Sequence, residues 1–63
     1  MISVYVEHRI GEMYIGYTYF LEDKQWQITE CIGELKEVQS IGQDEVPDAI
    51  VKAVSILLEG ELG

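Results

Sequence analysis

The chain has few of the residues that small proteins use for covalent support or for chemistry. Its 63 residues include one cysteine, one histidine and one proline. A lone cysteine excludes a disulfide within the chain. Cys31 and His8 together are also too few soft ligands for a structural zinc site, which takes four. Stability therefore has to come from a packed apolar core or from self-association.

Basic residues are scarce as well. Four Lys and Arg stand against 12 Asp and Glu, which gives a net charge of −8. Nucleic acid and anionic membranes attract proteins of the opposite charge, so we expect no direct binding to either. No apolar run approaches the ~18 residues that a membrane span needs. Residues 1–9 lack the order of a signal peptide, and the lone cysteine fits a reducing compartment, so we expect a cytoplasmic protein.

No group of residues forms a recognisable catalytic set. His8 has no second histidine and no partner at a spacing that would build a Ser–His–Asp triad. Cys31 has Glu30 and Glu34 as neighbours, which disfavour a thiolate, so we interpret it as a buried structural cysteine. The carboxylates lack the spacing of an EF-hand loop, and no glycine-rich phosphate loop occurs. We expect a protein that is not an enzyme and uses no metal or cofactor.

The remaining composition is that of a globular domain, with 48% hydrophobic residues. Residues 2–10 alternate between apolar and polar side chains, which predicts a half-buried strand. Gly11-Glu12 suits a type II′ hairpin turn, and residues 13–21 form the second alternating segment. A polar turn at Glu22–Gln25 leads to a third strand, 26–32, with Trp26, Ile28 and Ile32 directed inward.

The pattern changes along the last third of the chain. Gly33 marks a bend or a bulge, and residues 35–41 form a weaker segment that suits a fourth strand at a sheet edge. From Pro47, placed as the first helical residue, an apolar pattern of helical period continues to a cap at Gly60. Residues 1–63 are thus predicted to form one α+β domain. Its fold is a three- or four-stranded antiparallel meander followed by one C-terminal helix packed on one face.

The apolar arc of this helix is wider than one sheet needs, at ~220°. The predicted core stripe consists of Val46, Ala49, Ile50, Ala53, Val54 and Leu57. Val51 and Leu58 lie outside it and require another cover. Either a curved sheet or Leu62 folding back covers them, or they form the contact of a homodimer.

Acidic and tyrosine side chains are the remaining candidates for a working surface. We assign partner binding to eight carboxylates in the middle of the chain, namely Glu22, Asp23, Glu30, Glu34, Glu37, Asp44, Glu45 and Asp48. Tyr5, Tyr14 and Phe20 share the strand face opposite the main apolar set. Tyr5 and Tyr14 are candidate aromatic contacts because tyrosine is enriched at protein interfaces. Cross-strand pairs that only stabilise a hairpin are the alternative explanation.

In size, charge and lack of catalytic motifs, the chain resembles small acidic phage proteins that block host defence, such as anti-CRISPR and DNA-mimic anti-restriction proteins. That class shares no motif, so the resemblance assigns no residue. It implies a non-catalytic inhibitor in the host cytoplasm, whose acidic surface occludes a basic, nucleic-acid-binding site of a target protein.

The order of three strands and a helix over residues 2–58 is also similar to the compact domain of HicB-type antitoxins. The family's Pro-Gly-Cys-like segment and its Glu-Glu-Ala helix start are both absent, and Cys31-Ile32-Gly33 is only a scrambled version of the first. This resemblance implies an antitoxin that folds as a dimer. A small dimeric accessory subunit of a larger complex is a further alternative.

Overall fold

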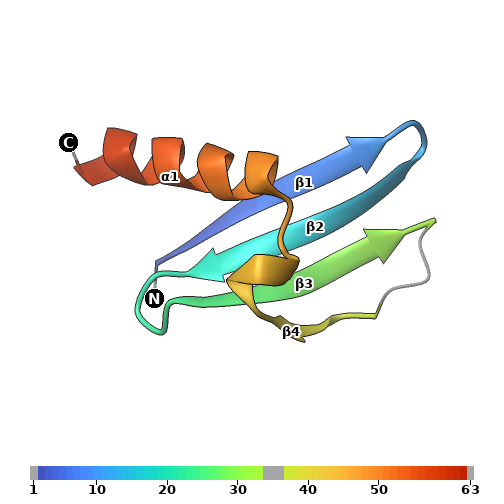
Figure 1. Ribbon diagram of the computed structural model, residues 1–63, viewed down its shortest axis with the longest axis horizontal. Helices are drawn as coiled ribbons and strands as arrows, with labels where there is room; N and C mark the ends of the chain where they lie inside the picture. The colour runs from blue at the N-terminus through green and yellow to red at the C-terminus, as the bar shows by residue number, and fades with distance from the viewer. Residues whose placement is uncertain (1, 34–36, 63) are drawn as a thin grey trace.

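Four antiparallel strands and one long helix make up the fold in the computed structural model, which describes residues 2–33 and 37–62 (Figure 1). The sheet has the order β1-β2-β3-β4. Its strands are β1 (Ser3–Ile10), β2 (Met13–Phe20), β3 (Gln25–Ile32) and β4 (Gln39–Ile41). A 3₁₀ turn, η1 (Gln43–Glu45), leads to α1 (Asp48–Leu62), which lies on one face of the sheet. The predicted α+β meander with a C-terminal helix is confirmed, and it has four strands.

Two turns of the meander depend on left-handed backbone. Gly11 has φ +63° and joins β1 to β2 through a two-residue loop, as a type II′ turn requires at its first position. Lys24 has φ +54° at the end of the β2–β3 turn, where a residue with a Cβ atom is strained. Gly33 has φ +79° directly after β3 and provides the predicted bend.

A β-bulge interrupts the pairing of β2 with β3. Tyr17 pairs with Ile28 while the preceding Gly16 pairs with Glu30, so Thr29 is the extra residue. The bulge shifts the alternation of β3 by one position. As a result Cys31 packs against the core, and Ile32, predicted to point inward, is 48% exposed. The prediction for Ile32 was wrong because a strict period of two does not allow for the extra residue.

The core lies between the sheet and α1. Its buried apolar residues are Ile15, Tyr17, Trp26, Ile28, Val46, Ile50 and Val54. Trp26 also stacks at a tilt on Tyr19, with ring centroids 4.9 Å apart. The indole nitrogen of Trp26 is buried without a hydrogen-bond partner in the described residues, which costs about 1–3 kcal/mol. Two large aromatic side chains thus fill the centre of the small core.

The helix is rotated from the predicted orientation. Val51 and Leu58 pack against the core, whereas Ala49 and Leu57, predicted as core residues, are exposed. The cover that we expected for Val51 and Leu58 is therefore the chain's own sheet. This removes the packing argument for placing a dimer contact at these two residues.

The helix boundaries also differ from the prediction. The carbonyl oxygen of Pro47 accepts from the N–H groups of Ile50 (2.9 Å) and Val51 (3.1 Å), so Pro47 directly precedes the helix. The helix does not stop at Gly60 but continues to Leu62. Asp44 and Glu45 belong to η1, which leaves Asp48 as the acidic residue in the first turn of α1. No helix in residues 2–33 and 37–62 is long and apolar enough to cross a membrane.

Candidate protein-binding surface

One face of the sheet is covered by no other element in the part of the chain that the structure describes. We call it the open face; it carries the side chains of β1, β2 and β3 that point away from α1. Its members are Ser3, Tyr5, Glu7, Arg9, Tyr14, Gly16, Thr18, Phe20, Gln25, Gln27, Glu30 and Ile32. The predicted placement of Tyr5, Tyr14 and Phe20 on the face opposite the core is confirmed.

Tyr5 crosses the open face from β1 toward β3. Its ring lies over Gly16 of β2, where a Cβ atom would come within 2.6 Å of Tyr5 Cε1. Glycine at this position therefore leaves the space that the ring occupies. The Tyr5 hydroxyl reaches Glu30 Oε2 at 3.0 Å, although 25 residues separate the two in sequence.

Two carboxylates converge on the Tyr5 hydroxyl. Besides Glu30, Glu7 Oε2 lies 3.1 Å from it. One hydroxyl proton can be donated to only one of the two at a time. Arg9 Nη1 donates to Glu7 Oε1 at 2.8 Å, and its guanidinium lies 5.0 Å from the ring centroid of Tyr14. Glu7 thus has a cation beside it, whereas no ion pair involving Glu30 is found in the described residues.

Both tyrosines are held in their neutral form by this arrangement. Desolvation, together with hydrogen bonds to Glu30 and Glu7, raises the pKa of Tyr5 well above its ordinary value of 10.0. A hydrogen bond to Glu30 also raises the pKa of Tyr14. Glu30 thus contributes to the raised pKa of a tyrosine on each of two neighbouring strands.

Threonines fix the strand that carries Glu30. The hydroxyls of Thr18 and Thr29 lie 2.9 Å apart, and Thr29 Oγ1 donates to the Gly16 carbonyl oxygen at 3.4 Å. The bulged residue is thereby tied to β2 on both sides of the bulge. Because Glu30 follows directly, its direction across the open face is set by a hydrogen-bonded strand.

This cluster has the chemistry to bind a cationic group. Carboxylates accept hydrogen bonds from guanidinium and ammonium groups, and tyrosine faces attract both. Arg9 already occupies such a position, between Glu7 and the face of Tyr14. In residues 2–33 and 37–62, no three His, Cys, Asp or Glu side chains group as metal ligands.

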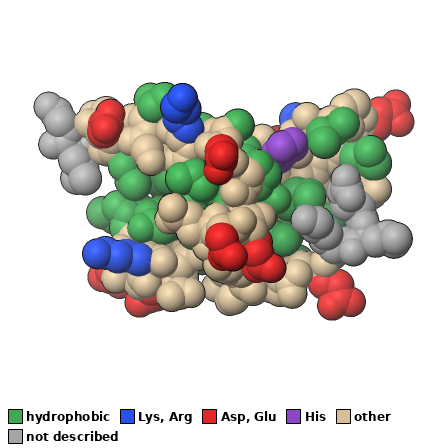
Figure 2. All heavy atoms as spheres, viewed as in Figure 1, with side chains coloured by type: hydrophobic (Ala, Val, Ile, Leu, Met, Phe, Trp, Pro, Cys, Tyr) green, Lys and Arg blue, Asp and Glu red, His purple; other side chains and the backbone are tan. Residues whose placement is uncertain are grey.

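The predicted acidic residues do not form one patch. Glu22 and Asp23 lie in the β2–β3 turn, Glu37 precedes β4, and Asp44, Glu45 and Asp48 follow one another through η1 into α1. Figure 2 shows acidic side chains near both ends of the long axis and around its middle. Glu30 lies on the open face, away from the helix, and Glu34 falls outside the described residues.

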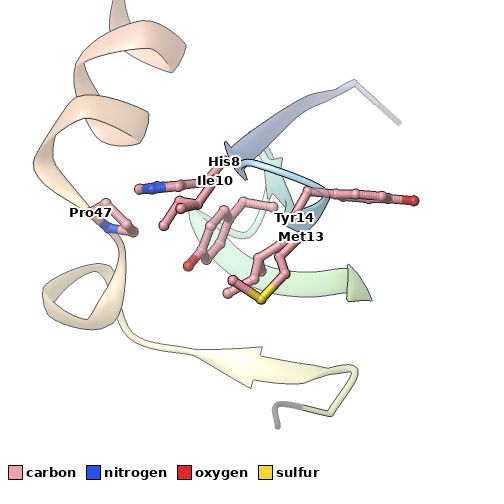
Figure 3. A pocket seen from close by; sticks show the side chains of 7 residues that line it. His8, Ile10, Met13, Tyr14 and Pro47 are labelled. Carbon is pink, nitrogen blue, oxygen red and sulfur yellow. The ribbon is translucent and has the colours of Figure 1, made fainter. Parts of the chain in front are cut away.

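His8 lies apart from the open-face cluster. It lines a cavity of about 260 Å³ at the hairpin end of the covered face, together with Ile10, Met13, Pro47 and, from the cluster, Tyr14. In Figure 3 its ring points toward Pro47 with Ile10 beside it, while Tyr14 points away. The described lining is mostly apolar and places no acid or nucleophile next to the imidazole.

Sequence reasoning missed three members of the cluster. Glu7, Arg9 and Gly16 were not assigned to any site, although Glu7 pairs with Gly16 and Arg9 with Tyr14 across the first hairpin. The two-residue turn at Gly11 fixes that pairing, so the signal was present in the sequence. The link from Tyr5 to Glu30 had no such signal, because it depends on the bulge at Thr29.

The geometry of the open face is the basis for assigning a function. Comparisons with models of known protein families, with characterised proteins and with solved structures found no match for this chain.

Proposed function

We propose that the protein binds and blocks a basic, nucleic-acid-binding surface of another protein, and that the open face makes the contact. The observation that carries the proposal is the convergence of Glu7 and Glu30 on the Tyr5 hydroxyl, on a face that no other element in residues 2–33 and 37–62 covers. An arginine of the partner would donate to a carboxylate and lie over a tyrosine ring, as Arg9 does with Glu7 and Tyr14.

Charge supports a basic partner. The net charge of −8 draws a cationic surface toward the molecule and repels nucleic acid. Carboxylates at the β2–β3 turn and in η1 add to the long-range field without having to touch the partner. We therefore assign the short-range contacts to the open face and the attraction to the whole acidic chain. An inhibitor of the anti-CRISPR or anti-restriction kind would combine such a contact surface with long-range attraction by the whole acidic chain.

Displacement of DNA provides the test. An arginine-rich peptide is bound to a fluorescently labelled DNA duplex, and release of the duplex is measured as this protein is added. We expect release that weakens steeply with added salt, because charge contacts are screened. No release at low salt would overturn the proposal.

A pair of variants separates the open face from bulk charge. Glu30→Gln and Glu59→Gln each remove one negative charge, but Glu59 lies on the exposed side of α1. We expect Glu30→Gln to weaken release strongly and Glu59→Gln to have little effect. Equal effects of the two variants would show that total charge, and not the open face, is responsible.

A further inference from the structure

The outer edge of β1 is a second unpaired surface, independent of the open face. In an antiparallel pair, residues alternate between those that bond to the neighbouring strand and those that bond away from it. The Leu21 N–H donates to the Ile2 carbonyl oxygen at 3.2 Å, and Ile2 lies opposite Leu21 in the register. The even-numbered residues of β1 therefore bond to β2. Ser3, Tyr5, Glu7 and Arg9 direct their backbone N–H and C=O groups outward, where no element in residues 2–33 and 37–62 pairs with them.

The two edges of the sheet are not equivalent. β4 at the far edge has three residues, and short edge strands are one way in which proteins prevent edge pairing. β1 has eight residues, contains no proline and pairs in register throughout with β2. It therefore offers a regular template for one more strand.

Exposed apolar residues continue from this edge onto the helix. A groove of about 610 Å³ is lined by Ser3 and Tyr5 of the open face and by Val4, Leu57 and Leu58 of the covered side, so it lies at the sheet margin. From there a row of small and apolar residues, all exposed except the half-buried Ala53, runs along α1. We call it the outer helix face; it consists of Ala49, Ala53, Ile56, Leu57 and Gly60, at helical spacing.

We propose that a second copy of this chain pairs antiparallel along β1, about a two-fold axis at Val6, to form a continuous eight-stranded sheet. In the register that overlaps the whole strand, Ile2 lies opposite Ile10 of the second copy, and Val6 lies opposite itself. Ile2 and Ile10 are 67% and 58% exposed at the two ends of one strand. They face the same side of the sheet, so each covers the other in this register.

Charge along β1 favours a second copy over an unrelated strand. Its charged side chains are Glu7 and Arg9, which cancel, whereas the rest of the chain carries the whole net charge of −8. The full register places Glu7 opposite Tyr5, and Arg9 opposite Ser3, so no like charges face each other directly. The two outer helix faces then approach on one side of the sheet, where Ala49, Ala53 and Gly60 allow close packing.

Pairing also joins the two open faces. Tyr5 and Glu7 lie on the edge strand, so the clusters of the two copies become neighbours across the axis. The dimer does not depend on the proposed function, since it rests on the strand edge and on the outer helix face.

The first test measures the mass of the protein in solution and compares two matched variants in α1. We expect sedimentation equilibrium to give twice the mass of one chain, with dissociation on dilution. Leu57→Glu should raise the dimer dissociation constant by at least about tenfold, because it places a charge in the apolar contact. Ser55→Glu adds the same charge on the polar side of α1 and should leave the constant nearly unchanged. A single-chain mass at millimolar concentration would overturn the proposal.

The register has its own test. In a Cys31→Ser background, Val6→Cys should form a disulfide between copies on mild oxidation, because position 6 faces itself at a non-hydrogen-bonded pair. Val4→Cys should not, since it lies opposite His8 of the second copy. Amide hydrogen exchange should show Tyr5 and Glu7 becoming protected as concentration rises, while Val4 and Val6 stay protected throughout. Dimers in which Tyr5 and Glu7 remain unprotected would overturn pairing along β1.

Discussion

The two faces of the sheet are built from alternate residues of the same strands, yet they are stabilised differently. The covered face is apolar and buries Ile15, Tyr17 and Ile28 beneath α1. The open face holds its side chains through hydrogen bonds and an ion pair, with Tyr5 extended over a glycine. The difference separates two sources of order: apolar burial stabilises the covered face, whereas polar contacts hold the side chains of the open face, which we propose for partner binding.

The largest expected effect on stability comes from shortening one of two isoleucines of β3 that lie on opposite faces of the sheet. Ile28 is 2% exposed on the covered face and Ile32 is 48% exposed on the open face. Ile28→Ala should lower the free energy of unfolding by about 3 kcal/mol, and Ile32→Ala by under about 1 kcal/mol. Urea denaturation followed by circular dichroism measures both. Similar losses would mean that the open face is covered by something in solution.

Gly16→Ala should have the next largest effect. The added Cβ atom would meet the Tyr5 ring, so Tyr5 has to leave its position and lose its contact with Glu30. We expect a loss of about 1–2 kcal/mol in thermal unfolding.

Combining Gly16→Ala with Tyr5→Ser should restore part of that stability, because the clash is gone. Strictly additive losses in this double-mutant cycle would contradict the contact between Tyr5 and Gly16. Gly60→Ala, measured at a concentration at which the chain is monomeric, provides the control: its Cβ atom meets nothing within 4 Å, and alanine favours the helix, so no loss is expected.

Tyr5→Phe tests the polar network without removing the ring. At neutral pH the loss should stay below about 1 kcal/mol, since Tyr5 is 46% exposed. The raised pKa of Tyr5 means that the neutral form stabilises the fold, so its contribution is complete below pH 10 and is lost as pH rises through the folded-state pKa. Denaturation series from pH 9 to 12 should therefore fall more steeply for the native chain than for Tyr5→Phe. Parallel series would contradict the network.

The smallest effect belongs to a turn residue outside both faces. Lys24 has φ +54°, which glycine adopts without strain. Lys24→Gly should raise stability by less than about 1 kcal/mol, and thermal unfolding measures the change. Lys24→Ala removes the same charge but keeps the strain, so it should bring no gain.

Much of the fold follows from local patterns. The alternation in residues 2–10 and 13–21 predicted the first hairpin, its turn and the side of each tyrosine, because a two-residue loop leaves only one register. The helix and its position on one face followed from the change of period after Gly42.

What could not be predicted depends on tertiary packing. The apolar arc of the helix spans ~220°, so the sequence pattern alone does not determine which half of the arc packs on the sheet. The structure turns Ile50, Val51, Val54 and Leu58 toward the core, a half without alanine, whereas the predicted stripe contains two alanines with less apolar area to bury. The side of the sheet on which Glu30 lies could not be predicted either, because the sequence of residues 28–30 contains no signal for a bulge.

The bulge at Thr29 decides which face of the sheet receives each side chain in the second half of β3. Thr29 is one residue more than regular pairing requires, and every side chain after it takes the side that it would otherwise not have. If the chain kept Thr29 and paired regularly, Glu30 and Ile32 would turn inward and Cys31 outward, and Tyr5 would lose its acceptor. A chain without Thr29 would need no bulge, and Glu30, Cys31 and Ile32 would keep their present sides and partners. The bulge therefore corrects the phase of the strand by one residue: it places a carboxylate on the open face and a thiol toward the core.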